Sequence, residues 1–140
     1  MINGINSREM ILEILLEIEE GEHSHVAIRN ALSKYQFLPK QDRAFITRVC
    51  EGTLEYRIQI DYIINSFSKV TVDKMKPAIR EILRSAVYQL KYMDSVPDSA
   101  VCNEAVKLAQ RKGFYNLKPF VNGVLRTICL LYTSPSPRDA

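Results

Sequence analysis

The sequence predicts an all-α protein, and three observations lead to this prediction. Apolar residues recur at spacings of three and four along most of the 140-residue chain, which is the period of a helix that buries one face. No segment alternates polar and apolar residues for long, so strands are not indicated. Prolines and glycines stand between the periodic segments, where they end one helix and begin the next. We therefore expect about seven helices with short connections, packed as a helical bundle.

The first three helices are expected before residue 56. Asn6 opens the stretch Asn-Ser-Arg-Glu, which resembles a capping box, and Gly21 provides a natural end for the first helix. A second, shorter helix is expected to begin after Ser24 and to run to about Tyr35, where Gln-Phe-Leu-Pro then interrupts the pattern. Pro39 suits the first turn of a third helix, since no backbone donor is lost there. Gly52, near the end of that helix, indicates either close helix packing or a joint.

Four further helices follow. The segment 56–67 carries isoleucines at helical spacing, and Pro77 begins a fifth helix with a buried stripe. A sixth helix is expected over residues 98–112, and Gly113 ends it. Pro119 opens the seventh helix, whose pattern runs to residue 128. The residues expected in the core of these helices include Ile60, Ile63, Ile64, Phe67, Ile79, Ile82, Leu83, Ala86, Val87, Leu90, Phe120, Val121, Val124, Leu125 and Ile128.

The composition fits one folded domain. The hydrophobic content is 46% and the charged content 25%, both ordinary for a soluble globular protein, and a chain of this length can bury a core without metals or disulfides. No apolar run approaches the length that a membrane span needs. Residues 1–10 lack the basic start and the apolar stretch of a signal peptide. We therefore expect a cytoplasmic protein with no membrane partner.

The residues that usually carry chemistry are scattered. Cys50, Cys102 and Cys129 are widely spaced, and no CxxC motif or Cys/His pair has metal-ligand spacing, so no metal site is predicted. For Cys50 and Cys102, which sit in apolar surroundings, we favour buried and unreactive thiols. His23 and His25 would point in different directions on a helix. Because a glycine-rich phosphate loop is also missing, we predict no catalytic residue and no enzyme activity in this chain.

Charge is distributed unevenly along the chain. Residues 1–22 hold one Arg and six Glu, a net charge of −5, whereas residues 23–140 hold eighteen Lys and Arg against ten Asp and Glu, a net charge of +8. An acidic first helix on a basic body predicts two faces with different partners. A basic body suits nucleic acid, whose phosphates Lys and Arg neutralise with release of counterions. Solvated surface charge is the more common alternative.

The fifth helix carries the first group of candidate phosphate contacts. Arg80, Arg84, Tyr88 and Lys91 follow helical spacing along one side of it. A tyrosine among cations can stack on an unpaired base. For Arg84 we favour a structural role, in an ion pair with a carboxylate such as Glu104.

Residues 105–128 supply the second group. This segment contains five cations and no acidic residue, namely Lys107, Arg111, Lys112, Lys118 and Arg126. Cations grouped in this way can neutralise several phosphates of one strand. The residues that we expect to contact RNA, taken from both groups, are Arg80, Lys107, Arg111, Lys112 and Lys118.

Three stretches of the sequence resemble a known domain. They are QDRAFITRVCEGTLEYRIQIDYII, IREILRSAVYQLKYMDSVPDSAVCNEAVKLA and PFVNGVLR. Together they are similar to the NusB-like RNA-binding domain, over nearly the whole chain before its tail. The resemblance implies an all-α fold of two packed helical subbundles, with RNA as a partner. We assign this domain to residues 1–128 and expect it to be truncated at its C-terminal end.

Two kinds of protein carry this domain. One is the free-standing antitermination factor NusB, which binds a leader RNA together with a ribosomal protein. The other is the small-subunit rRNA 5-methylcytosine methyltransferase (RsmB/Sun type), which has the domain at its N-terminus. The stretch DRAFITRVCEGTLEYR resembles the methyltransferase module more closely, and Arg126 stands where antitermination factors more often have an acidic residue. Arg8 is the only basic residue before His23, in contrast to the Arg-rich opening of antitermination factors.

The resemblance therefore favours an RNA-positioning module from the front of an rRNA cytosine methyltransferase, with small-subunit rRNA as its RNA. The S-adenosylmethionine loop and the Pro-Cys nucleophile of that family are absent from this sequence. We expect no cofactor in this chain, and we expect S-adenosylmethionine in a missing catalytic domain that is itself a partner. The alternatives are a free-standing antitermination factor and a protein-interaction module that docks a partner through the acidic first helix.

The last twelve residues have a different character. The stretch CLLYTSPSPRD, residues 129–139, is similar to one translated frame of a transposase-type sequencing adapter. Pro135 and Pro137 oppose helix formation there. We therefore expect residues 129–140 to be a disordered, adapter-derived tail without a role in function.

Overall fold

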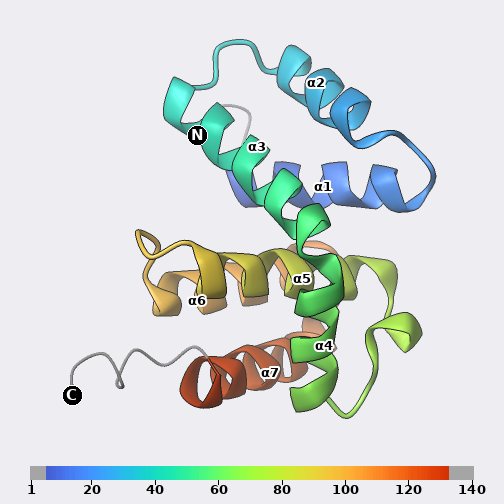
Figure 1. Ribbon diagram of the computed structural model, residues 1–140, viewed down its shortest axis with the longest axis vertical. Coiled ribbons are helices and arrows are strands. Elements are labelled where there is room, and N and C mark those ends of the chain that lie inside the picture. Colours follow the sequence, from blue (N-terminus) through green and yellow to red (C-terminus); the bar gives the residue numbers. More distant parts are fainter. Residues whose placement is uncertain (1–5, 133–140) are drawn as a thin grey trace.

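The computed structural model describes residues 6–132, and the regular secondary structure of this region is helical throughout (Figure 1). Within these residues there is no strand, so the predicted all-α class is confirmed, as is the expected number of about seven helices. No helix in the described region has the length and the apolar character needed to cross a membrane. The elements are α1 (Ser7–Glu19), α2 (Ser24–Lys34), α3 (Lys40–Glu55), α4 (Arg57–Phe67), η2 (Val72–Lys74), α5 (Pro77–Tyr92), α6 (Asp98–Arg111), η3 (Tyr115–Leu117) and α7 (Lys118–Leu131).

The helices form two groups that share α5. Figure 1 shows α1, α2 and α3 in one group and α4, α6 and α7 in the other, with α5 between them. α5 packs against α1 and α3 from the first group and against α4, α6 and α7 from the second. Residues 81–90 are all buried, so α5 is enclosed by its neighbours instead of burying a single stripe. The two packed subbundles implied by the family resemblance are therefore present.

Local caps fix the ends of several helices. Asn6 Oδ1 accepts a hydrogen bond of 2.8 Å from the backbone N–H of Glu9, so one half of the predicted capping box is formed. Gly21 and Gly113 have φ values of +116° and +91°, which residues with a side chain rarely adopt. They follow α1 and α6, where the sequence predicts helix ends. Pro77 is the first residue of α5, as predicted.

The start of α3 differs from the sequence-based expectation, whereas Gly52 near its end fits one of the two expected roles. Pro39 is the N-cap of this helix and lies just before its first turn. Gly52 is buried, and a Cβ atom there would overlap the phenol ring of Tyr88 on α5, so this glycine allows close helix packing. The joint lies four residues later at Tyr56, which separates α3 from α4 with φ −104° and ψ 22°.

One apolar core extends through both groups of helices. Each fully buried Leu or Ile side chain contributes about 1.5–3 kcal/mol relative to an exposed one. Because α5 carries core residues that face both groups, the two groups are fixed relative to each other and α6 and α7 rest on a rigid base. The largest fully buried side chains are Ile11, Leu12, Ile14, Leu15, Ile46, Ile60, Ile63, Ile64, Ile79, Ile82, Leu83 and Leu125.

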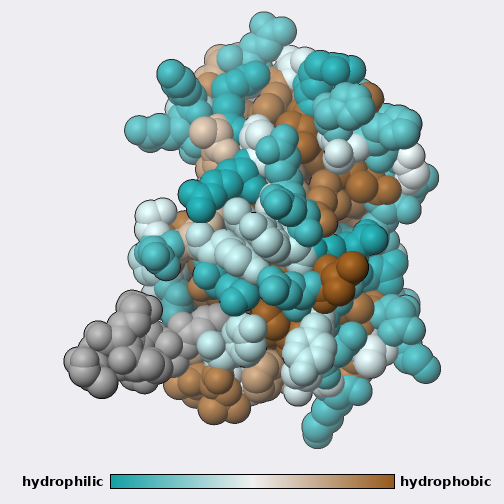
Figure 2. All heavy atoms as spheres, viewed as in Figure 1, coloured by the Kyte–Doolittle hydropathy of each residue, from teal (hydrophilic) through white to brown (hydrophobic). Residues whose placement is uncertain are grey.

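α7 extends three residues further than predicted. It continues to Leu131, so the disorder that we expected from Cys129 onward is wrong for residues 129–131. The half-buried Cys129 packs on the core, and the Tyr132 N–H donates to the Ile128 carbonyl. Figure 2 shows hydrophobic side chains gathered near this end of the molecule, where Leu130 and Leu131 are exposed. The remainder of the expected tail, residues 133–140, lies outside the described residues.

Candidate nucleic-acid interface

A surface groove separates the polar faces of α6 and α7. These two helices pack against each other and are connected through the short turn η3. The groove has a volume of about 430 Å³ and brings together Lys107 and Lys118, two of the five residues predicted to contact RNA. Its lining residues are Asn103, Val106, Lys107, Lys118, Pro119 and Asn122.

Arg126 joins the two walls of this groove. Its guanidinium donates hydrogen bonds of 3.2 Å to Asn122 Oδ1 on α7 and 3.1 Å to Asn103 Oδ1 on α6. Because the oxygen of each amide accepts from Arg126, the NH₂ group is the end of each amide that remains for a ligand. The groove therefore presents amide donors beside its lysines, and both kinds of donor suit phosphate oxygens.

The two lysines differ in how they are held. Lys107 has a side chain that is 64% exposed and lies 3.6 Å from Glu104, a distance typical of a weak surface ion pair. Lys118 donates a 2.8 Å hydrogen bond to Gln110 Oε1 and lies 4.4 Å from the centre of the Tyr115 ring. Tyr115 is 67% exposed, so this end of the groove carries an aromatic ring that can stack on an unpaired base.

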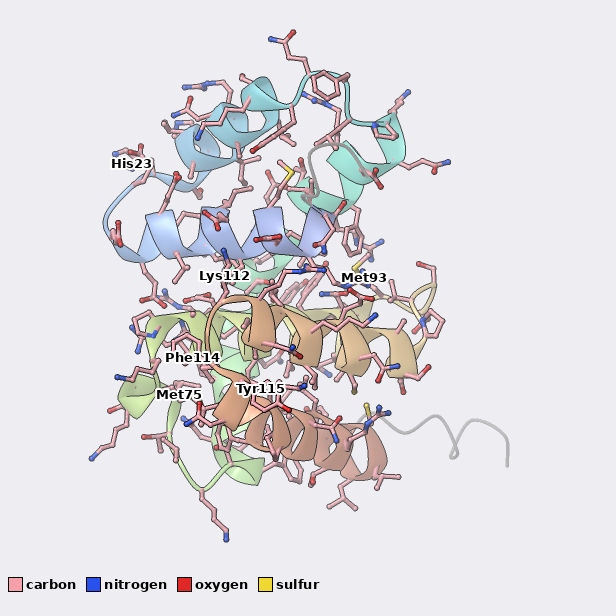
Figure 3. All side chains as sticks on the ribbon, turned by 180° about the vertical axis from the view of Figure 1, so that it is seen from behind. His23, Met75, Met93, Lys112, Phe114 and Tyr115 are labelled. Carbon is pink, nitrogen blue, oxygen red and sulfur yellow. The ribbon has the colours of Figure 1, made fainter. Side chains whose placement is uncertain are left out.

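Arg111 and Lys112 turn away from the groove toward α1. Lys112 Nζ lies 2.5 Å from Glu13 Oε2 and 3.4 Å from Glu9 Oε2, and Arg111 lies 3.7 Å from Glu9 Oε1. Figure 3 shows Lys112 between the end of α6 and α1, whereas Tyr115 lies on the α7 side. The hydrogen bond to Glu13 raises the pKa of Lys112. These two predicted contacts are therefore ion-paired within the molecule.

Arg80 is held by internal acceptors and is not part of the groove. Its guanidinium donates to both carboxylate oxygens of Glu19 at 2.8 and 2.7 Å, and to the carbonyl oxygens of Met75 and Val72 at 3.1 and 3.3 Å. Only 20% of the side chain is exposed. The expectation that Arg80 faces RNA therefore has no support in the geometry, because its donors already join α5 to α1 and to η2.

The neighbouring residues on α5 are also internal. Arg84 is buried and forms ion pairs of 2.7 Å with both Asp61 and Glu81, instead of pairing with Glu104 as expected. Tyr88 is only 5% exposed, so its ring is not available to stack on a base. The sequence places these residues on one side of a helix, but α5 has a helix packed against each side.

The acidic first helix pairs with the basic body of the same molecule. Glu9 and Glu13 contact the end of α6, and Glu19 contacts α5. The prediction of two faces with different partners is wrong for these three carboxylates. Arg8 is half-buried beside the Phe45 ring, with 5.2 Å between the guanidinium carbon and the ring centre. The N-terminal helix therefore offers little free positive charge.

The thiols show no sign of reactivity. Cys50 and Cys102 are buried, and burial raises the pKa of both thiols. This supports the prediction that these two thiols are unreactive. Burial also raises the pKa of Cys129 to about 12. In the part of the chain that the structure describes, no group of three or more His, Cys, Asp or Glu side chains is arranged to hold a metal ion.

Asn103, Asn122 and Tyr115 were missed as candidate contacts. The sequence contains a signal for the first two, because Asn103 precedes Lys107 by four residues and Asn122 precedes Arg126 by four, which places each pair on one helix face. That the two faces meet across one groove depends on how α6 packs on α7. Tyr115 follows a glycine turn and carries no periodic signal.

A helical fold of this kind is known from solved structures. The structure of antitermination factors NusB and NusE in complex with dsRNA matches with a TM-score of 0.82 at 21% sequence identity, over 90% of this chain and 95% of that one. The structure of T. maritima NusB matches with a TM-score of 0.83 at 23% identity, over 96% of this chain and 95% of that one. At these identities the likeness establishes the fold class alone: a two-part all-α domain.

Sequence comparison then establishes the family. The model of the NusB family matches residues 5–129, and the chain belongs to this family. It is 34% identical over 121 residues to the probable ribosomal RNA small subunit methyltransferase B of Bacillus subtilis, covering 86% of this chain. It is 42% identical over 100 residues to the transcription antitermination protein NusB of Acidothermus cellulolyticus, covering 68% of this chain and 69% of that protein. The chain spans 27% of the length of two methyltransferase relatives.

Proposed function

We propose that this chain is an RNA-binding domain that orients an RNA strand through the groove between α6 and α7. The observation that carries the proposal is the convergence of Lys107, Lys118 and Arg126 with two amide donors on one groove. Contacts of this kind fix the position of a nucleic-acid strand through its phosphates, without reading its sequence. A solved relative with this fold is described in complex with dsRNA, which supports an RNA partner.

We further propose that the parent protein is a small-subunit rRNA cytosine methyltransferase, with small-subunit rRNA as the bound RNA. Arg126 supports this choice, because antitermination factors more often have an acidic residue at this position. An acidic side chain there would place negative charge between Asn103 and Asn122, where Arg126 places positive charge. The similarity to the Bacillus subtilis methyltransferase over 121 residues also supports it. S-adenosylmethionine would supply the methyl group in a separate catalytic domain, and the residues described here would position the RNA.

A free-standing antitermination factor is the second candidate. The observation that favours it is coverage, since this chain covers 69% of the Acidothermus cellulolyticus antitermination protein and 92% of that of Bacillus velezensis. Sequencing the source gene beyond residue 128 separates the two candidates. A continuing reading frame with a glycine-rich loop and a Pro-Cys dipeptide supports the methyltransferase, whereas a stop codon shortly after residue 128 supports the antitermination factor.

RNA binding is tested by titrating the purified chain into labelled small-subunit rRNA fragments at several salt concentrations. We expect the logarithm of the affinity to fall linearly with the logarithm of the salt concentration, by about 0.7 for each phosphate neutralised on a single strand. Lys107→Gln combined with Lys118→Gln is expected to weaken binding and to reduce this slope by about 1.4. Lys34→Gln, an exposed charge change on α2, is the matched control and is expected to leave the slope nearly unchanged.

Two results would count against the proposal. If the folded chain shows no salt-dependent binding, the RNA-binding role is wrong and the protein-interaction module becomes the better interpretation. If the Lys107 and Lys118 variant binds as tightly as the Lys34 control variant, RNA lies on another surface of the molecule.

A further inference from the structure

We propose that Glu9 and Glu13 compete with RNA phosphates for Arg111 and Lys112, and that α1 thereby sets the affinity and the salt dependence of the interface. The inference rests on the proposed RNA-binding function and adds an internal competitor at the border of the same surface. The competing groups belong to helices α1 and α6, which lie side by side in the fold.

The ion pairs join the start of α1 to the end of α6. Lys112 lies within 3.4 Å of both carboxylates, and Arg111 lies 3.7 Å from Glu9. The pairs lie beyond one end of the groove along the chain: Arg111 directly follows Gln110, which accepts a hydrogen bond from Lys118, while the side chains of Arg111 and Lys112 turn toward α1. A strand that leaves the groove at the end of α6 and continues toward α1 would meet two cations that are already neutralised.

The exposure of these side chains allows them to change partners. The side chain of Glu13 is 58% exposed and that of Arg111 is 44% exposed, whereas the side chain of Lys112 is 24% exposed. The Lys112–Glu13 and Arg111–Glu9 pairs each have one well-exposed member, and breaking such a surface ion pair costs no more than about a fivefold factor in an equilibrium constant; the Lys112–Glu9 pair is more enclosed, with side chains 24% and 19% exposed. A phosphate can therefore displace a carboxylate at moderate cost, and the carboxylates reduce the affinity without abolishing it.

The alternative is that the pairs only fasten α1 to α6. In that case their removal lowers stability and leaves RNA binding unchanged. Competition predicts instead that RNA binding becomes tighter, because removing a carboxylate frees a cation for RNA. The two roles are therefore distinguished by measuring RNA affinity and thermal stability on the same variants.

The test uses Glu13→Gln and the double variant with Glu9→Gln, titrated with a labelled single-stranded small-subunit rRNA fragment. We expect the affinity to rise by about two- to fivefold for Glu13→Gln. For the double variant we expect the slope against log salt to steepen by about 0.7 for each cation released. Glu17→Gln is the matched control, because Glu17 lies one turn further along α1, is exposed, and forms no ion pair among residues 6–132. It is expected to change the affinity much less.

A double-mutant cycle that combines Glu13→Gln with Lys112→Gln tests whether Glu13 changes the RNA affinity through Lys112. We expect the gain from Glu13→Gln to disappear in that background. If the wild-type chain binds RNA and Glu13→Gln gains no more than Glu17→Gln, or gains equally without Lys112, competition is wrong and the pairs are structural. If the wild-type chain and all variants are folded but bind no RNA, the proposed function itself fails, together with this inference.

Discussion

At Gly52 the absence of a side chain decides how closely α3 approaches α5. A Cβ atom would overlap the Tyr88 ring, which is buried and stacks on Tyr92 with 5.2 Å between ring centres. Gly52→Ala therefore forces a shift in a packed region, and we expect it to lower the free energy of unfolding by about 1–3 kcal/mol. Urea denaturation monitored by circular dichroism measures this change.

Gly123 on α7 provides the control for Gly52. No atom lies within 4 Å of the position that a Cβ would take there. Gly123→Ala is therefore expected to raise the free energy of unfolding by about 0.5–1 kcal/mol, because alanine is the better helix former. If both alanine variants are stabilised, the close approach at Gly52 is less restrictive than the geometry indicates.

Glu81 and Glu19 have opposite titration behaviour within one network. The hydrogen bond from Arg80 lowers the pKa of Glu19 to about 2. Burial raises the pKa of Glu81 to about 8, and its hydrogen bond with Glu19 acts in the same direction, although Arg84 opposes it. Glu81 therefore keeps its proton to a higher pH than Glu19, and its carboxyl accepts a hydrogen bond of 2.7 Å from Arg84.

This difference predicts how stability depends on pH. A raised pKa in the folded state means that the Glu81 contribution is complete below pH 4.5, the ordinary value, and is lost as the pH rises through about 8. The wild-type free energy of unfolding should therefore fall between pH 5 and about 8. Glu81→Gln, which mimics the protonated form, should remove most of this decline. Urea titrations at several pH values measure it, and an equal decline in the variant would contradict the assignment.

At the scale of single elements, α1 shows how a cap and a tertiary contact share one residue. The Glu9 backbone N–H binds the Asn6 side chain, while its carboxylate turns to Arg111 and Lys112. The capping box of the sequence is thus only half formed, because the cations at the end of α6 attract the carboxylate.

The cap is open to a direct test. Asn6→Ala removes the acceptor for the Glu9 N–H and should lower the free energy of unfolding by about 1 kcal/mol. Asn6→Asp retains an acceptor at the same position and should restore most of the loss. Thermal denaturation of the three proteins provides the comparison, and equal losses for alanine and aspartate would show that the cap contributes little.

At the scale of the whole molecule, α5 is the element that both helix groups need. It contacts α1 and α3 as well as α4, α6 and α7, and its residues 81–90 are buried. Arg84 pairs with Asp61 of α4 and lies 3.8 Å from Glu19 of α1, so the charge network also spans both groups. Neither group retains its core when α5 unfolds.

We therefore expect one cooperative unfolding transition for both groups. Methyl resonances of Ile46 in α3 and Val124 in α7, followed by NMR during a urea titration, should give the same midpoint and the same slope. Separate midpoints would show that one group remains folded without the other and that α5 does not couple them.

Part of the candidate site could be predicted from the sequence, but not which of its cations are free. Lys107 and Lys118 were identified from a segment without acidic residues, and they meet in the groove. Arg111 and Lys112 were identified by the same criterion and Arg80 by helical spacing along the fifth helix, and their carboxylate partners lie 61 to 103 residues away in sequence. Local charge counts cannot detect such partners, because ion pairs between helices depend on how the helices pack.

The sequence by itself determined the helical class, most helix ends and the family. These properties depend on local rules, namely apolar period, caps, proline and glycine, and on motifs that survive as strings of residues. Only the tertiary structure decided that α5 is enclosed, that α1 neutralises part of the basic surface, and that Lys107 and Lys118 share one groove whose walls Arg126 joins. The physical reason is that burial and Coulomb energy depend on distances in space between residues that are far apart in the chain.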